Sequence, residues 1–399
     1  MRILHVIPSL GPSRGGPSFV LRTLARGLAD AGVEVHVAST DDDGRERLDV
    51  SCGVPITDAG VTYWFFRRQT RFYSVSLPLN RWLAQHVADY DVVHIHALFS
   101  FSSVAAAYWA RVRQVPYVIR PLGTLNRWGI GNRRRWLKRL SLRFLERRVL
   151  EGSAAIHFTS EQERLEAAEL GIALANRYAI IPNPLEPGET AGAMARGLLR
   201  SQHSDLGNRI WILFLSRLDR KKGLDLLLPA FARLRARHPE VALILAGDGD
   251  PDFVARLRRQ AAALKIERDL VWTGFVTGEA KRAAFADSDI FVLPSYSENF
   301  GVAVLDAMAS GLPVVVSDGV AVHGEISEAK AGLVVPCEEK ALWQALSSLV
   351  EDAGLRSTLG RNGRILSLSF SVEKVVAKLL ELYDRVAERT PSHAGFPRN

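Results

Sequence analysis

The sequence predicts an α/β protein that contains two doubly wound domains. Its 399 residues exceed the length that one ordinary hydrophobic core supports, so two domains of roughly two hundred residues each are expected. Each half contains a series of short apolar runs separated by helical patterns, which is typical of parallel sheets covered by helices. A polar, glycine-containing stretch that begins at Pro187 separates the two series.

This break sets the expected domain boundaries. A first domain is predicted over 1–190 and a second over 205–370. The last helical pattern, 371–389, has the apolar spacing of a packing helix, and the polar residues 390–399 are expected to form a disordered tail.

Composition limits the compartment and the class of partner. The two cysteines, Cys52 and Cys337, form neither a disulfide framework nor a metal-ligand spacing, so a cytoplasmic protein is expected. The first apolar run is too short for a signal peptide, and no window approaches the length of a membrane span. The net charge of +8 predicts an anionic partner. Nucleic acid is not expected, because no interleaved aromatic platform or known RNA-binding signature is present.

The first half begins with a strand, a glycine-rich loop and a helix. Gly15 and Gly16 lie in this loop and can let the backbone approach a ligand, although the loop matches neither the dinucleotide fingerprint nor the phosphate-binding P-loop. The alternative is a flexible surface loop. Strands of the first domain are predicted at 3–7, 34–38, 91–99, 117–120, 155–158 and 179–181.

His94 and His96 are two residues apart in the strand predicted over 91–99, so their side chains share one face. Such a pair could bind a metal ion, but no third ligand is apparent nearby in the sequence. Pocket or packing histidines are therefore the favoured interpretation.

The stretch 133–150 is predicted to be a long amphipathic helix. Trp136, Leu140 and Phe144 recur every four residues. A parallel stripe contains the basic residues Arg135, Arg139, Arg143 and Arg147. This combination suits peripheral contact with an anionic membrane, and the alternative is a sheet-covering helix with an arginine-rich solvent face.

The second half repeats the alternation of strands and helices. Its strands are predicted at 209–215, 242–246, 270–273, 290–293, 314–317 and 333–335. The loop SRLDRKKG follows the first of them and contains Arg217, Lys221 and Lys222 just before a helix. Fixed cations and free amides at this position could hold a diphosphate, whereas the alternative is a solvated basic loop.

A second turn, within LPSYSENFGVAVLDAMASGLPVVV, places Glu298 before a helix and Asp306 inside it. The free N–H groups at Phe300 to Val302 suit phosphate oxygens, and the carboxylates suit sugar hydroxyls. An ordinary strand-to-helix turn is the alternative. The motif AGDGD could bind a metal ion through Asp248 and Asp250, but its composition favours a tight turn.

Together these motifs resemble the GT-B glycosyltransferases, specifically glycosyltransferase family 4. The order SRLDRKKG, AGDGD, TGF (273–275) and SENFGVAVLDAMASGLPVV carries the resemblance, supported by the GG loop, HIHALFSF and IPNP (181–184). The similarity spans nearly the whole chain. It implies two Rossmann-like domains that face a central cleft, with the last helix, 371–389, crossing back to pack on the first domain.

The resemblance also implies an activity. A member of the family moves a sugar, with retention of configuration, from a nucleotide-diphosphate donor to a saccharide or lipid-linked acceptor hydroxyl in glycan biosynthesis, with no cofactor and no essential metal. Catalytic roles would fall to Glu298, Lys222 and Arg217. The residues implied in donor binding are Gly15, Gly16, Asn183, Arg217, Lys222, Phe275, Glu298, Phe300, Gly301, Val302 and Asp306.

Two departures from the family pattern bear on activity. Asp306 stands where the family usually has Glu, so its contact to a ribose would be longer or bridged by water. Leu122 stands where the family often has His, which leaves His96 as the substitute. Two alternatives to sugar transfer therefore stay open, a related enzyme that epimerises or phosphorolyses a sugar nucleotide and a catalytically weak sugar-nucleotide-binding protein.

Overall fold

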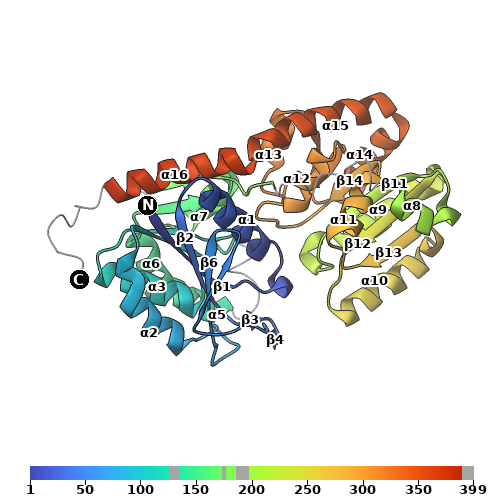
Figure 1. Ribbon diagram of the computed structural model, residues 1–399. Coiled ribbons are helices and arrows are strands. Elements are labelled where there is room, and N and C mark those ends of the chain that lie inside the picture. The colour runs from blue at the N-terminus through green and yellow to red at the C-terminus, as the bar shows by residue number, and fades with distance from the viewer. Residues whose placement is uncertain (126–134, 173–176, 186–196, 389–399) are drawn as a thin grey trace. The chain divides into compact units, whose positions relative to one another are not determined.

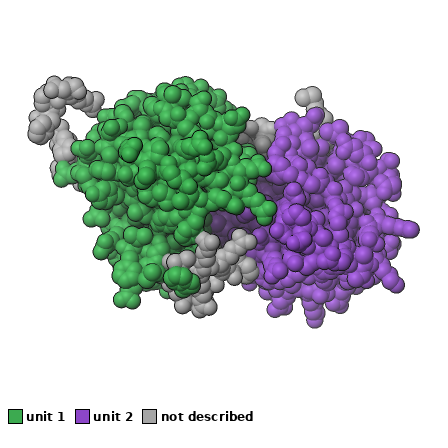
Figure 2. All heavy atoms as spheres, turned by 90° about the horizontal axis from the view of Figure 1, so that it is seen from below, with its two compact units in different colours: residues 1–184, 372–399 green, residues 185–371 purple. Residues whose placement is uncertain are grey.

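The computed structural model describes residues 1–125, 135–172, 177–185 and 197–388. The chain divides into two compact units, unit 1 formed by Met1–Pro184 and Val372–Asn399, and unit 2 formed by Leu185–Ser371 (Figure 2). The predicted tail 390–399 and the first two residues of the predicted basic helix, 133–134, lie outside the described residues.

Unit 1 contains an eight-stranded sheet in the order β10-β9-β8-β7-β1-β2-β6-β5 (Figure 1). All neighbours are parallel except β5 and β6, which form an antiparallel hairpin. The sequence does not predict this hairpin, because all four residues of β5 are exposed and form no apolar run. The strands are β1 (Arg2–Ser9), β2 (Glu34–Thr40), β5 (Pro55–Asp58), β6 (Val61–Phe66), β7 (Val92–His96), β8 (Tyr117–Arg120), β9 (Ala155–Phe158) and β10 (Tyr178–Ile180), with a separate short pair, β3 (Asp42–Asp43) and β4 (Glu46–Arg47).

Three helices of unit 1 begin at serine caps. The side chains of Ser76, Ser100 and Ser160 each accept a hydrogen bond from an N–H of the first turn, which satisfies a donor that the helix itself cannot. The predicted basic helix is interrupted by a π-helical turn, Leu142–Glu146. The helices are α1 (Gly16–Asp30), α2 (Leu77–His86), α3 (Phe101–Val112), α5 (Arg135–Ser141), α6 (Arg147–Glu151), α7 (Glu161–Glu169) and α16 (Val372–Glu388).

The last helix, α16, belongs to unit 1 and lies against α1 and β7 (Figure 1). Gly27 of α1 permits this close approach, since a Cβ atom there would lie 2.4 Å from Val372 Cγ1. The Tyr383 hydroxyl, 2.6 Å from His94 Nδ1, joins α16 to the middle of the sheet. Burial of the apolar face of α16 thus completes the core of unit 1.

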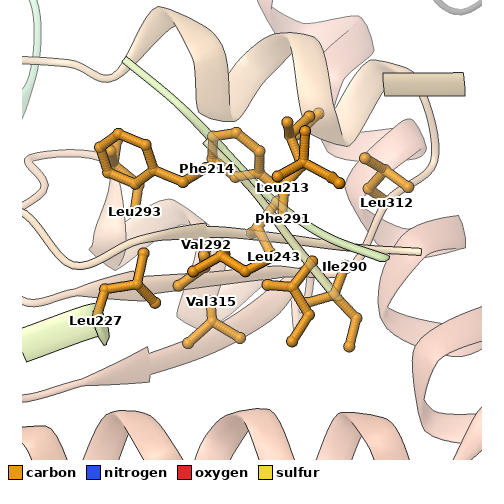
Figure 3. Close-up of a cluster of buried hydrophobic side chains, with 14 of the residues drawn as sticks. Leu213, Phe214, Leu227, Leu243, Ile290, Phe291, Val292, Leu293, Leu312 and Val315 are labelled. Carbon is orange, nitrogen blue, oxygen red and sulfur yellow. The ribbon is translucent and has the colours of Figure 1, made fainter. Parts of the chain in front are cut away.

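Unit 2 contains a six-stranded, wholly parallel sheet in the order β13-β12-β11-β14-β15-β16. Side chains of its central strands, among them Leu213, Phe291 and Val292, form a buried apolar cluster (Figure 3). Because all six strands are parallel, their carboxyl ends meet at one edge of the sheet. The strands are β11 (Ile210–Leu215), β12 (Val241–Ala246), β13 (Leu270–Gly274), β14 (Ile290–Leu293), β15 (Val314–Ser317) and β16 (Gly332–Val335).

Unit 2 begins earlier than residue 205, the predicted start of the second domain. The N–H groups of Gly197, Leu199 and Arg200 donate to the Asp287 carboxylate, and the Arg200 guanidinium lies 4.6 Å from the centre of the Trp211 ring. These contacts fix a short helix that the polar composition concealed. The helices are α8 (Leu198–Gln202), α9 (Leu224–Arg237), α10 (Pro251–Ala263), α11 (Gly278–Ala286), α12 (Val302–Ala309), α13 (His323–Glu328), α14 (Glu339–Glu351) and α15 (Ala353–Ser367).

None of the helices in the described parts of the chain is both long enough and apolar enough to span a lipid bilayer.

Candidate active site

The loop 216–223 of unit 2, called the lysine loop below, follows the carboxyl end of β11. It makes a short 3₁₀ turn, Arg220–Lys222, before α9. The Asp219 side chain begins this turn by accepting from the Lys221 N–H at 3.1 Å. Gly223 ends it with φ of +71°, and a Cβ atom there would lie 1.9 Å from the Pro294 carbonyl oxygen. Only glycine satisfies both the left-handed backbone and this close approach, so Gly223 allows the loops after β11 and β14 to touch.

The contact between these loops brings together the two predicted site motifs. Lys222 Nζ forms an ion pair with Glu298 Oε2, and the Tyr296 N–H donates to the Lys221 carbonyl oxygen at 2.8 Å. The Lys222 side chain is 7% exposed and that of Glu298 is 17% exposed, so the ion pair is largely shielded from water. A partly buried ion pair of this kind holds the two loops together, because burying either charge without the other would be costly.

The charge state of Glu298 results from two opposing effects. Burial acts to raise the pKa of this carboxyl, but the charges of Lys222, Lys221 and Arg217 outweigh it and lower the pKa below the ordinary value. The carboxyl is therefore ionised at neutral pH and can accept hydrogen bonds from hydroxyl groups. Its backbone is held by the Glu298 N–H, which donates to Gly319 O at 2.8 Å.

Lys221 and Arg217 complete the cationic side of the site. Burial, followed by the charges of Lys222 and Arg217, lowers the pKa of Lys221, while Glu298 and Asp219 oppose the shift. Arg217 is exposed, and its charge acts on both Glu298 and Lys221. Three cations thus surround one carboxylate, an excess of positive charge that suits a dianionic or trianionic ligand.

The amino-terminal end of α12 adjoins Glu298. Gly301 caps it in the left-handed conformation, with φ of +84°, and Val302 is the first helical residue. The first N–H groups of a helix have no carbonyl partner within it, so they are available to an anion or an acceptor. The Phe300 side chain is buried at 2% exposure and meets Phe370 edge-on at 5.9 Å, so only the backbone of Phe300 is placed to contact a ligand.

Asp306 lies within α12 and is only 2% exposed. Its Oδ2 atom is 3.1 Å from Nζ of Lys281, which comes from α11. The sequence does not predict Lys281 as part of the site, because an isolated lysine on an exposed-looking helix carries no motif. The predicted ribose contact of Asp306 would therefore be made by a carboxylate that already has a cationic neighbour.

The motif AGDGD forms a tight turn at the carboxyl end of β12. Asp250 caps α10 by accepting from the Phe253 N–H at 3.2 Å, and Asp248 accepts from the Gly249 N–H at 2.7 Å. The turn packs against the lysine loop, since a Cβ atom at Gly247 would lie 1.9 Å from Ser216 O. Phe275, which follows β13 at the same edge of the sheet, is 64% exposed. These contacts agree with the turn interpretation of Asp248 and Asp250.

The predicted donor-binding glycines of unit 1 lie between β1 and α1. Gly15 has φ of +75° and ends a 3₁₀ turn, Pro12–Arg14, and Gly16 is the first residue of α1. No atom lies within 4 Å of a Cβ built at Gly16. Gly16 is exposed, so the start of α1 presents its backbone at the surface of unit 1.

His96 lies in a buried cluster of four histidines in unit 1. His96 Nε2 is 2.9 Å from His5 Nδ1, and His157 Nδ1 is 3.3 Å from His94 Nε2. The third histidine near His94 and His96 is therefore His5, on the neighbouring strand β1, which the sequence search missed because it lies 89 residues before His94. Burial, reinforced by the charge of Arg120, lowers the pKa of His5 to about 3.

This position does not support the predicted catalytic role of His96. Its ring is completely buried, and burial lowers its pKa well below the ordinary value, so the imidazole is neutral and shielded from solvent. Asn183, predicted to bind donor, is also buried, and its Oδ1 atom accepts from the Arg120 guanidinium. Both residues pack around the carboxyl ends of β7 and β8, which is the role of pocket or packing residues.

The predicted basic helix presents its apolar stripe to solvent. Trp136, Leu140 and Phe144 are 68%, 50% and 52% exposed. The last turn of the predicted helix, by contrast, is buried at Val149 and Leu150, so this part packs into unit 1 while the stripe is exposed.

Comparisons with known proteins agree with these features. Residues 197–366 match the family model described as glycosyl transferases group 1, and residues 15–184 match that of a glycosyl transferase 4-like domain. The chain is 27% identical to D-inositol 3-phosphate glycosyltransferase of Pseudarthrobacter chlorophenolicus, over 98% of this chain and 96% of the relative. It is 28% identical to phosphatidyl-myo-inositol mannosyltransferase of Mycolicibacterium smegmatis, over 97% and 94%.

Solved structures share the fold. HepE of Anabaena, crystallised with UDP and glucose, gives a TM-score of 0.76 at 20% identity, over 96% of this chain and all of that one. Sucrose-phosphate synthase of Thermosynechococcus elongatus gives 0.78 at 22% identity, over 98% of this chain and all of that one. The predicted α/β architecture and the predicted family are confirmed: the chain belongs to the GT-B glycosyltransferases of group 1, with a family 4-like first domain.

Proposed function

We propose that the chain transfers a sugar from a nucleoside diphosphate sugar to a hydroxyl of a saccharide or lipid-linked acceptor, with retention of configuration. The observation that carries this proposal is the ion pair between Lys222 and Glu298, surrounded by Arg217 and Lys221 and adjoining the amino-terminal end of α12. Cations and helix amides suit a diphosphate, and the ionised carboxylate suits the hydroxyls of the attached sugar.

In the proposed reaction, the bond between the anomeric carbon and the diphosphate oxygen breaks. A bond forms between that carbon and the acceptor oxygen, and the acceptor hydroxyl gives up its proton to the leaving diphosphate. Negative charge grows on the diphosphate as it departs, and Lys222, Lys221 and Arg217 are placed to offset it. Fixed charges that act where charge develops are a major source of catalysis, so this chain's own cations could replace a metal ion.

Related proteins support the donor and acceptor classes. HepE was crystallised with UDP and with UDP-glucose, and the two curated relatives act on an inositol phosphate and on phosphatidyl-myo-inositol. We therefore expect the donor to be a nucleoside diphosphate sugar, and a lipid-linked acceptor is consistent with the exposed apolar stripe of α5 and the following turn.

Peripheral contact with an anionic membrane at the inner face is part of the proposal. Trp136, Leu140 and Phe144 are apolar and exposed, and the sequence places a stripe of arginines beside them. A helix with this composition lies in the plane of a membrane interface, with its apolar side chains inserted and its cations near lipid phosphates.

The test is sugar transfer by the purified chain from a panel of nucleoside diphosphate sugars, with EDTA present and with the anomeric configuration of the product read by NMR. Lys222→Ala should reduce turnover by at least about a hundredfold. Arg220→Ala is the matched control, because Arg220 lies in the same turn but is exposed. Normal turnover in Lys222→Ala, or failure of every diphosphate sugar to act as donor, would contradict the proposal.

A further inference from the structure

Unit 1 contains a cavity of about 500 Å³ that no part of the proposed transfer uses. It lies between α3 and the segment that runs from the π-helical turn into α6. A volume of this size is typical of small-molecule sites, which are mostly apolar with a few placed polar groups. Its lining residues are Val104, Ala107, Tyr108, Arg111, Val112, Leu145, Arg148 and Val149.

The floor and the rim of the cavity differ in exposure. Ala107 and Val149 are buried, at 2% and 4% exposure, and form an apolar floor. Tyr108, Val112 and Leu145 are 57%, 51% and 43% exposed, although all three are large and apolar for most of their surface. Large apolar side chains gathered around an opening mark a surface that binds an apolar group.

Two arginines define the charge of the opening. Within the described residues, neither Arg111 nor Arg148 has an ion-pair partner. Both arginines line the cavity. Gly152, which ends α6, lies against α3, because a Cβ atom there would lie 3.1 Å from Arg111 Cδ. Two guanidinium groups at the mouth of an apolar cavity favour a ligand that has an anionic head and an apolar tail.

The surroundings of the cavity indicate where such a ligand comes from. Leu145 directly follows Phe144 of the exposed apolar stripe, and the two side chains are 43% and 52% exposed. The sequence from 135 to 151 has six basic and two acidic residues, and one of the acidic residues, Glu146, is buried against Tyr73 and Ser141. The cavity therefore opens beside the surface proposed to contact an anionic membrane.

We propose that this cavity binds an anionic membrane phospholipid, with an acyl chain against Ala107 and Val149 and the phosphate between Arg111 and Arg148. The inference rests on the proposed membrane contact and adds to it a specific lipid site. The apolar stripe alone would insert without selecting a lipid, whereas two guanidinium groups at a defined opening select a phosphate.

The first experiment measures binding of single lipid molecules to the full chain by calorimetry. Dioctanoyl phosphatidylglycerol, kept below its critical micelle concentration, should bind at one saturable site. The same chains on phosphatidylcholine should bind at least about fivefold more weakly, and glycerol 3-phosphate, which has no chain, should not bind measurably. Equal affinity for the two lipids, or no lipid binding at all, would overturn the proposal.

Substitutions identify the cavity as the site. Arg111→Gln with Arg148→Gln should weaken phosphatidylglycerol binding about tenfold or more. Arg81→Gln with Arg113→Gln removes the same charge from exposed arginines of unit 1 without touching the lining, and should change the affinity less than about twofold. Val112→Trp, which extends a side chain that is 51% exposed, should block the opening without disturbing the core. Equal effects of the two arginine pairs, or no effect of Val112→Trp, would refute this site.

Vesicle sedimentation separates this inference from the membrane contact on which it rests. Binding to phosphatidylglycerol vesicles without binding of the monomeric lipid would leave the membrane contact standing and refute the lipid site. Binding of the monomeric lipid without vesicle binding would support the lipid site and refute the membrane contact. Sugar transfer to a water-soluble acceptor in the absence of lipid tests the enzyme activity independently of both.

Discussion

At Glu298, one carboxylate faces three cations before any ligand arrives. Lys222 is neutralised by the ion pair, so an incoming diphosphate must share Lys222 with Glu298 or take it over. The pair therefore holds the lysine in place, and the additional charge of Lys221 and Arg217 provides the attraction for the anion.

This arrangement predicts opposite effects of Glu298→Gln on binding and on transfer. The amide keeps the shape of the side chain but releases Lys222, so affinity for a free nucleoside diphosphate should stay equal or rise. Sugar transfer should fall by about 10² to 10³, because the ionised group that accepts from the sugar hydroxyls is lost. Calorimetry and steady-state rates measure the two effects, with Glu339→Gln, at an exposed residue that begins α14, as the control. Parallel losses of binding and transfer would contradict this division of roles.

Lys221 predicts a feature of the pH profile. Its pKa is lowered, chiefly by burial, so it loses its proton at a lower pH than an exposed lysine does. Transfer should therefore decline on the alkaline side as this cation is lost, and kcat/KM should fall before exposed lysines titrate. Lys221→Arg keeps the charge at all working pH values and should move the alkaline limb upward. If the alkaline decline of kcat/KM stayed at the same pH in Lys221→Arg, or moved equally in Arg220→Lys, another group would be responsible for it.

The partners missed from the sequence are side chains that come together only through tertiary structure. Lys222 and Glu298 can be predicted as site residues because each lies at a strand's carboxyl end before a helix, but the sequence does not show that they pair. Neither Lys281 nor His5 belongs to a sequence motif. Each contacts a residue on another element, Lys281 on α11 with Asp306 on α12, and His5 on β1 with His96 on β7. Burial of His96 is likewise decided by neighbouring strands rather than by local sequence.

At the scale of elements, Gly223 is the point on which the site geometry depends. Gly223→Ala should destabilise unit 2 by more than the roughly 1 kcal/mol expected for a strained left-handed residue, because the new Cβ meets Pro294 O. It should also separate Lys222 from Glu298 and weaken donor binding. Gly207→Ala is the matched control, with φ of +57° and no atom within 4 Å. Urea unfolding and donor titration compare the two, and equal effects would mean that only the backbone angle matters.

The exposed apolar stripe on α5 and the following turn should contribute to membrane binding but not to folding stability. Trp136→Ser with Phe144→Ser should lower binding to anionic vesicles several-fold, because each side chain contributes apolar area to the interface. The unfolding midpoint should hardly move, since exposed positions contribute little to folding. Phe72→Ser, at another exposed aromatic residue in unit 1, serves as the control. Unchanged vesicle binding would leave the stripe without the proposed role.

The success of sequence prediction at this scale follows the strength of the local pattern. The predicted strands 117–120, 155–158, 290–293 and 314–317 coincide with β8, β9, β14 and β15, because each is a short continuous buried run. Proline or aspartate directly flanks three of them, β8, β14 and β15. The β5 and β6 hairpin, by contrast, depends on an edge strand whose four residues are all exposed. The π-helical turn Leu142–Glu146 keeps an uninterrupted helical pattern in sequence, so only the structure shows it.

At the scale of the whole molecule, the buried histidines link the stability of unit 1 to pH. Burial lowers the pKa values of His5, His94, His96 and His157 below the ordinary 6.5. Below about pH 6.5 the unfolded chain takes up protons that the folded chain does not. Stability is therefore full above that pH and falls with acidification, by up to about 1.4 kcal/mol per pH unit for each histidine.

His157→Gln tests this linkage, since the amide can still donate to Ile181 O, the partner of His157 Nε2. Urea unfolding between pH 5 and pH 7 should show a slope that is smaller by about 1.4 kcal/mol per pH unit at its acid end. A slope that is insensitive to His157 would mean that protonation of other groups causes the acid instability.

The return of α16 to unit 1 also has a consequence for the order in which the protein can be made. A ribosome releases the strands of unit 1 first, then all of unit 2, and only then the helix that carries Val375, Leu379 and Tyr383. At about 5 to 20 residues per second, roughly 10 to 40 s separate Pro184 from Glu388. During that interval the groove for α16 is empty and the hydroxyl that meets His94 is missing, so the half of the enzyme translated first is the last to become a finished domain.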